Sequence, residues 1–196
     1  MPQTKRQQQK EFTRQKIIDT AFRMYAVTGF STSTNAIAQE AEISHGAIFA
    51  HFPTREILQI TVIEQFAHEV GEKLHNLSGS SSNIAELLHA HIRIIEGYEP
   101  FYKKMISEFS TLPQEAMALL VSVQSIISYH FGIVIEREQK KETVKNILLH
   151  MLFNTWIGLL HYYLQNSELF APGASVLKKC KDELIDSFVR LISNQA

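Results

Sequence analysis

The residues around position 45 carry side chains that suit contact with the edges of DNA bases. Ser44, His45 and Asn35 can donate hydrogen bonds to base edges or accept them there. The side chain of Ala47 is a methyl group, which can contact the methyl group of thymine. Gly46 costs about 1 kcal/mol in a helix, and close approach of the backbone to DNA would explain its presence. Together these residues predict a surface that reads bases.

The spacing of these residues fits a helix-turn-helix motif. A short helix is expected over residues 35–41, then a tight turn at Glu42-Ile43, and then a second helix that Ser44 opens. In this motif the first helix crosses the DNA backbone, while the second places its N-terminal residues in the major groove. His51 and Arg55 then suit contacts with phosphates. A generic helical hairpin with polar loop residues has the same spacing, so spacing alone leaves both interpretations open.

Helical periodicity extends through most of the chain. Apolar residues recur at helical spacing over residues 17–26, and a long helix is expected after Pro53-Thr54. The segment 77–83, which is rich in Ser and Gly, is interpreted as a linker. Longer helices are expected beyond it, at residues 84–98, 100–110, 113–137, 140–165 and 173–193. The sequence therefore predicts an all-α fold of about nine helices, with an N-terminal three-helix head that holds the helix-turn-helix and a larger C-terminal helical body.

Composition excludes several classes of protein. The 196 residues are 45% apolar and 20% charged, with only 8 Gly and 5 Pro, which excludes collagenous and low-complexity chains. The single cysteine, Cys180, cannot form an internal disulfide, so a reducing, cytoplasmic location is expected. The first 30 residues lack an apolar run of the signal-peptide type. The apolar stretch 147–164 contains polar residues that are costly in a bilayer, so we expect a buried helix and no membrane span.

Charge is distributed unevenly along the chain. The net charge is −1, but the segment from Met1 to Lys16 has five cations and only one anion, Glu11. A basic head on a mildly acidic body points towards a nucleic acid. The basic segment is interpreted in two ways: as an arm that enters an adjacent minor groove, or as a solvated tail.

Residues 13–58 resemble the N-terminal domain of TetR-type repressors. The resemblance covers about Lys10 to Glu69. The matching positions are Ile17, Ala21, Phe22, Gly29, Phe30, Thr34, Ile37, Ala38, Ala41, Ile43-Ser44-x-Gly46, Phe49-x-His51-Phe52 and Leu58. It implies a DNA-binding domain at residues 10–70, with the motif at about 33–52, and a helical ligand-binding and dimerisation domain at residues 71–196.

The resemblance also implies a set of DNA contacts. Asn35, Ser44, His45, Gly46 and Ala47 fall where the family reads bases. Thr34, His51 and Arg55 fall where it binds phosphates, and Lys10 is expected to add affinity without sequence preference.

Three positions in the head depart from the family pattern. Phe49 is counted among the DNA contacts but stands where a Tyr hydroxyl usually meets the DNA backbone, so that hydrogen bond is missing. Ala50 stands where a larger side chain is common. Glu42 replaces a turn glycine, and a left-handed conformation there would cost on the order of 1 kcal/mol. These changes predict modest affinity for each head.

The last two helices predict a homodimer. The stretch 147–164 is apolar on nearly every face, so it needs cover on two sides. The last helix adds an apolar stripe formed by Leu177, Cys180, Leu184, Phe188 and Leu191. The resemblance implies that two such helices from each subunit form a four-helix interface. A large core within one chain is the alternative.

A polar stripe in the body suggests an effector site. His150, Asn154 and His161 lie within about 40° of one another around an ideal helix. They can pair across a dimer axis, or they can supply the polar groups of a mainly aromatic cavity. The expected lining is Tyr102, Met105, Phe109, His130, Phe131, Phe153, Asn154 and Trp156, and the expected effector is an unidentified small apolar or aromatic molecule.

No arrangement in the sequence indicates catalysis. His and Cys residues lack the spacing of a metal site, and no nucleophile or carboxylate pair can be placed together, so no enzyme activity, metal or cofactor is expected. The sequence predicts a ligand-responsive regulator, by default a repressor, which binds a pseudo-palindromic double-stranded operator as a dimer. The alternative is an all-α small-molecule-binding protein or enzyme in which the N-terminal helices are only structural.

Overall fold

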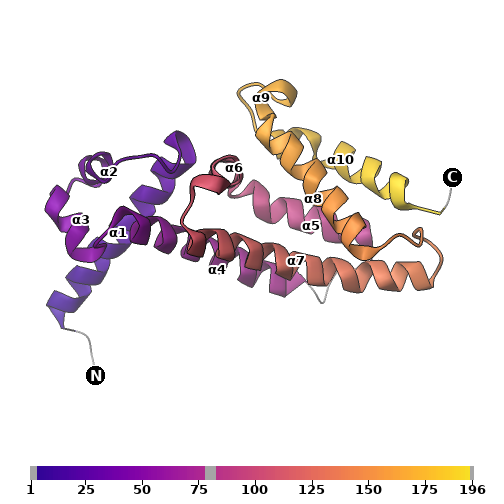
Figure 1. The fold of residues 1–196 in the computed structure, drawn as a ribbon, viewed down its shortest axis with the longest axis horizontal. Coiled ribbons are helices and arrows are strands. Elements are labelled where there is room, and N and C mark those ends of the chain that lie inside the picture. Colours follow the sequence, from indigo (N-terminus) through magenta and orange to yellow (C-terminus); the bar gives the residue numbers. More distant parts are fainter. Residues whose placement is uncertain (1–3, 78–82, 195–196) are drawn as a thin grey trace. The chain divides into compact units, whose positions relative to one another are not determined.

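The computed structural model describes residues 4–77 and 83–194, and this part of the chain is helical without a strand, which confirms the predicted all-α fold (Figure 1). The described helices are α1 (Lys5–Thr28), α2 (Thr34–Glu40), α3 (His45–His51), α4 (Arg55–Leu77), α5 (Ile84–Glu96), α6 (Glu99–Ser107), the 3₁₀ turn η1 (Phe109–Thr111), α7 (Gln114–Lys140), α8 (Leu149–Gln165), α9 (Ser167–Phe170) and α10 (Val176–Ile192).

Packing divides the chain into two compact units, each described on its own. The head unit comprises residues 1–66 and 100–120, and the body unit comprises residues 67–99 and 121–196. The expected domain boundary near residue 70 stays a prediction, but α6 packs with the head because Phe101 joins its aromatic core. The Phe101 ring stacks on Phe22 at 4.3 Å between centroids and lies 5.3 Å from Phe66.

The head unit is built on buried apolar faces of three helices. α1 contributes Ile17, Ile18, Ala21 and Tyr25, all at most 2% exposed. α2 and α3 are too short to be stable alone, so their stability comes from this packing. Each is opened by a serine: the Ser33 hydroxyl accepts from the Ala36 N–H, and that of Ser44 from the Ala47 N–H.

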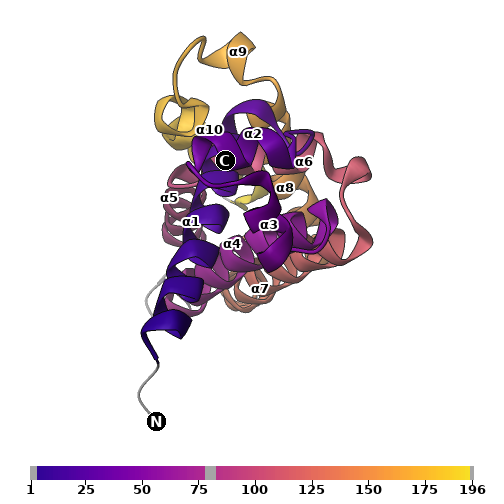
Figure 2. The ribbon, with the colours of Figure 1, turned by 90° about the vertical axis from the view of Figure 1, so that its left-hand side faces the viewer.

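The basic N-terminal segment is helical from residue 5 onward and not a disordered tail, while its contact with DNA stays a prediction. Lys5 to Lys16 form the first turns of α1, which begins with a capping box: the Thr4 hydroxyl accepts from the Gln7 N–H, and the Gln7 side chain accepts from the Thr4 N–H. Figure 2 shows these turns extending clear of α2 and α3.

The body unit packs α5, α8 and α10 around an aromatic core. The Trp156 ring lies 5.4 Å from that of Phe188, between centroids, and its Nε1 donates to His91 Nδ1 at 3.2 Å. The carboxylate of Glu99 is buried at the start of α10, where it accepts from the Val176 N–H at 2.9 Å and also from the Ser175 hydroxyl. This carboxylate satisfies amides that the helix itself leaves unpaired.

The predicted helix over residues 140–165 is wrong at its start. Residues 141–148 form a loop, with Glu142 at φ 59°, and α8 begins only at Leu149. The cause is a long-range contact with the end of α10. The Lys145 N–H donates to the Ile192 carbonyl at 2.8 Å, and Val144 forms an isolated antiparallel bridge with Ser193.

Among the described residues, α7 is the one helix long and apolar enough to cross a membrane, with a mean hydropathy of 1.8 over its most apolar window. In this structure 44% of that window is buried inside the protein. The core helix of a soluble protein has the same length and composition, so this feature is weak evidence for a membrane span.

Candidate nucleic-acid interface

The turn between α2 and α3 has the geometry that the helix-turn-helix prediction requires. Glu42 adopts the left-handed conformation, with φ 52°, which is the condition under which the sequence predicts strain on the order of 1 kcal/mol. The Ile43 N–H donates to the Ala38 carbonyl at 3.0 Å and so closes the turn. Ile37 and Ile48 are fully buried beneath it, so the relative placement of α2 and α3 is fixed by packing.

The expected base-reading residues lie on the outer surface of this motif. Asn35, Ser44, His45 and Gly46 are exposed, and Ala47 is half-buried. Gly46 has no structural need to be a glycine, because a Cβ atom there would meet nothing within 4 Å. A residue that weakens a helix and relieves no internal crowding indicates an external surface that approaches the backbone closely.

His45 is held in place by residues on both sides. Its Nε2 lies 3.0 Å from Thr34 Oγ1, which ties the start of α3 to the start of α2. Its ring packs edge-on against that of Phe49, with 5.0 Å between centroids. Phe49, which is 43% exposed, therefore positions the imidazole in addition to presenting its own ring to the surface.

Arg55 and His51, both expected at phosphates, lie partly buried in the head. The guanidinium of Arg55 donates to the Phe30 carbonyl, and Gln59 Nε2 donates to the same carbonyl at 2.8 Å. His51 is half-buried, with its Nδ1 buried and without a hydrogen-bond partner in the described structure. Phosphate binding by these two residues stays a prediction, while the structural role of Arg55 is to hold the loop before α2.

Sequence reasoning missed Glu108, which holds the other side of the same loop. Its Oε2 accepts from the Phe30 N–H at 2.8 Å. Gly29 adopts φ 86°, and a Cβ atom there would lie 2.1 Å from Glu108 Oε1. Gly29 was visible in the sequence as the end of the first helix. No local motif marks Glu108, because its partner Phe30 is 78 positions away.

The expected effector-lining residues do not form one group. Tyr102, Met105 and Phe109 belong to the head unit, and the other five belong to the body unit. Within the body, Phe131 packs against Phe153 at 5.6 Å between ring centroids, and Trp156 is fully buried, whereas Asn154 is exposed. Most of these residues are therefore members of the two cores.

Three histidines lie in or near the body core. Burial, together with the neighbouring His161, lowers the pKa of His91 to about 4. Burial likewise lowers the pKa of His161 to about 4. His130 is buried, and neither of its ring nitrogens has a hydrogen-bond partner among the described residues; desolvation lowers its pKa too. These environments favour neutral imidazoles at pH 7.

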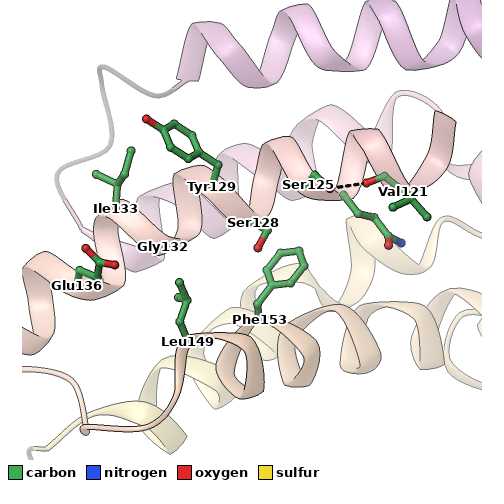
Figure 3. A pocket seen from close by; sticks show the side chains of 10 residues that line it. Val121, Ser125, Ser128, Tyr129, Gly132, Ile133, Glu136, Leu149 and Phe153 are labelled. Carbon is green, nitrogen blue, oxygen red and sulfur yellow. Dashed lines mark hydrogen bonds between the residues drawn. The ribbon is translucent and has the colours of Figure 1, made fainter. Parts of the chain in front are cut away.

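A groove of about 580 Å³ lies along α7 and α8 (Figure 3). From α8, Leu149 and Phe153 point towards α7, where Ser128 and Gly132 lie opposite (Figure 3). Phe153 is the one residue that this groove shares with the expected effector lining. Its size falls in the range of small-molecule sites, and its lining is mainly apolar with a few polar groups, namely hydroxyls, the amide of Gln124 and the carboxylate of Glu136, which suits a largely apolar ligand.

The apolar stripe of α10 is used inside the chain. Leu177, Cys180, Leu184 and Phe188 are buried, and only Leu191 is exposed. Exposed apolar side chains lie on α8, where Met151 and Tyr162 are each about half exposed, and also on α7, at Val121, Tyr129 and Ile133. Gly158 lies between Met151 and Tyr162, and a Cβ atom there would meet nothing within 4 Å. A second subunit would therefore find more uncovered apolar surface on α8 than on α10.

Comparison with known proteins agrees with this geometry. Residues 17–59 match the model of the bacterial regulatory proteins of the tetR family. The chain is 34% identical over 62 residues to an uncharacterised HTH-type transcriptional regulator, YuxN of Bacillus subtilis; the match covers 31% of this chain and about a fifth (21%) of that relative.

Solved structures share the fold over nearly the whole chain. A TetR-family regulator from Agrobacterium tumefaciens is 19% identical, with a TM-score of 0.77 over 94% of this chain and 99% of that one. The regulator FadR from Bacillus subtilis, solved in complex with stearoyl-CoA, is 15% identical, with a TM-score of 0.68 over 89% of this chain and 97% of its own.

Proposed function

We propose that this chain is a member of the tetR family of bacterial regulatory proteins, whose model its residues 17–59 match, and that it is a dimeric, ligand-responsive repressor that binds a pseudo-palindromic DNA operator. The proteins that it matches are transcriptional regulators and not enzymes. A bacterial regulator of this kind acts in the cytoplasm, where the chromosome lies.

One observation carries the DNA-binding proposal. The outer face of α3 presents His45 beside a glycine whose surroundings are empty, on a helix that Ile48 anchors in the head core. This face can lie against a major groove without moving the core. Asn35 and Ser44 add hydrogen-bonding groups at the starts of α2 and α3.

Selection from a random duplex library tests this proposal. The wild-type protein should enrich an inverted repeat whose half-sites lie about one helical turn apart or slightly more. His45→Ala should relax the preference at one position of each half-site, because a side chain that contacts a base supplies about 1–3 kcal/mol of discrimination. Enrichment of no sequence by the wild-type protein, under conditions in which it is folded, would contradict the proposal.

We further propose that the body unit binds the effector along the groove between α7 and α8. The groove is of suitable size and includes Phe153, three residues before Trp156, the single tryptophan of the chain. FadR, a structural neighbour, was solved with an acyl-CoA, stearoyl-CoA, which makes a long apolar ligand a reasonable class to screen. The effector must bind one arrangement of the two heads better than the other in order to change DNA affinity.

Fluorescence of Trp156 tests the effector site. A ligand that binds the groove should shift the emission of Trp156. Gly132→Leu should abolish the shift, because its Cβ atom would lie 3.0 Å from Leu149 Cδ2 and the rest of its side chain would fill the groove there. Val27→Leu, at an exposed position of the head, is a matched control. A compound that changes operator affinity equally in Gly132→Leu would exclude the groove as its site.

A further inference from the structure

The first turns of α1 form a helix that contributes nothing to the core of the head. Residues 5–12 are all exposed, and the first buried residue of α1 is Ile17. The capping box at Thr4 stabilises the start of the helix, but no tertiary contact explains why a further two turns continue past the head. The helical order of residues 5–12 therefore shapes an exposed surface and does not contribute to the core.

The cations of this segment share one side of the helix. Because each residue turns an ideal helix by about 100°, Arg6, Lys10 and Arg14 lie within an arc of about 80° around the helix axis. Lys5 and Lys16 complete a basic half of the circumference, and Glu11 lies outside it. Successive members of the Arg6, Lys10 and Arg14 row are separated by about 6 Å along the axis.

Two contacts show which side of α1 this basic half occupies. The guanidinium of Arg14 lies over the ring of Phe52, 5.2 Å from its centroid, at the end of α3. The Lys16 ammonium lies 3.9 Å from the carboxylate of Glu42, in the turn between α2 and α3. The directions of Arg6 and Lys10 fall between these two contacts around the helix axis. Both residues therefore point towards the side of the helix-turn-helix, one to two turns beyond it.

We propose that the N-terminal turns of α1 are a second DNA-binding element, which binds phosphates of the duplex next to the half-site that α3 reads. This proposal rests on the proposed DNA-binding function and adds a partner surface to it. Arg6 and Lys10 bind the phosphates, and the continuous helix holds them in register with α3. The contact is independent of base sequence, because it involves only the backbone of the duplex.

The salt dependence of binding to a random-sequence 30-base-pair duplex tests the proposal. Arg6→Gln/Lys10→Gln should reduce the slope of log affinity against log salt by about 1.8 for each chain, because each phosphate that a cation neutralises adds about 0.9 to that slope. Lys140→Gln/Lys178→Gln removes the same charge from exposed positions of the body and should leave the slope unchanged. Both variants should melt as the wild type does, because none of the four side chains is buried.

A third variant separates charge from helical order. Phe12→Pro keeps every cation but interrupts α1 between Lys10 and Arg14, at an exposed position. It should weaken duplex binding at least threefold. Wild-type affinity in Phe12→Pro would show a flexible basic arm and overturn the helical contact.

Failure of this proposal is distinguishable from failure of the proposed function. If the wild-type protein binds duplex with a steep salt dependence and Arg6→Gln/Lys10→Gln has the same slope, the α1 contact is excluded and the function stands. If the wild-type protein binds no duplex at all, the proposed function itself fails.

Discussion

Glu108 and Phe30 are joined by a hydrogen bond of 2.8 Å, although they are 78 positions apart in the sequence. The Phe30 N–H donates to the Glu108 carboxylate, while the Phe30 carbonyl accepts from Arg55 and Gln59. The backbone N–H and the backbone carbonyl of Phe30, in the loop that leads into α2, are thus both bound by side chains. This arrangement makes the position of the helix-turn-helix depend on the residue that follows α6.

Removal of the Glu108 carboxylate should destabilise the head. In Glu108→Ala the Phe30 N–H loses its partner next to a side chain that is 2% exposed. An unsatisfied buried amide costs about 1–3 kcal/mol, and we expect the lower half of that range because Glu108 is only half-buried. Urea unfolding measures the loss, and Glu115→Ala, at an exposed carboxylate of α7, is the control. Equal stability of Glu108→Ala and the wild type would contradict this role.

Gly29 and Glu108 should be energetically coupled. Gly29→Ala places a Cβ atom 2.1 Å from Glu108 Oε1 and also strains a backbone with φ 86°. In the Glu108→Ala background only the backbone strain remains, so Gly29→Ala should cost less there than in the wild type. A double-mutant cycle on the free energy of unfolding measures the difference, and strictly additive effects would show that the two residues act independently.

The stability of the body should fall as the pH drops from about 6.5 to about 4. The pKa of His91 is lowered to about 4 in the folded protein, mainly by burial. The unfolded chain therefore binds a proton first as the pH falls, and the stabilisation present above pH 6.5 is lost towards pH 4. For a shift of this size the loss is roughly 3 kcal/mol.

His91→Gln isolates this contribution from that of other groups. The glutamine oxygen can still accept from Trp156 Nε1, but it does not titrate. The difference in unfolding free energy between pH 7 and pH 5 should be smaller in His91→Gln than in the wild type. An unchanged difference would exclude His91 as a source of the pH dependence.

Gly158→Arg should convert the proposed dimer into a folded monomer. Within one chain the new side chain meets open space, and arginine is a better helix former than glycine, so the subunit should fold normally. Sedimentation should give about 22.4 kDa for this variant and twice that mass for the wild type. Gln8→Arg, at an exposed position of α1, should remain dimeric. A dimeric Gly158→Arg would place the interface elsewhere.

The features predicted correctly from the sequence are those that depend on neighbouring residues. The turn at Glu42, the cap at Ser44, and the apolar positions of α2 and α3 are all local, and each formed as expected. The helical state of Lys5 to Lys16 also had a local signal, the capping pair Thr4 and Gln7, which the interpretation as an arm or a tail overlooked.

The features missed depend on distant residues. Glu99 looks like an ordinary surface carboxylate in the sequence, yet it is buried against the start of α10, more than 70 positions away. The loop at residues 141–148 exists because Lys145 pairs with Ile192. The stripe on α10 was correctly recognised as apolar, but periodicity does not reveal whether such a face packs inside its own chain or against another.

Gly46→Leu is the most direct test of the central claim, that the outer face of α3 lies against DNA. The Cβ atom of the new residue has no neighbour within 4 Å, and leucine favours a helix by up to about 1 kcal/mol over glycine. We therefore predict unfolding at an equal or higher urea concentration together with a loss of operator affinity of at least tenfold, measured by fluorescence anisotropy on the duplex selected by the wild type. A Gly46→Leu protein that is equally stable and binds this duplex with unchanged affinity would contradict the account.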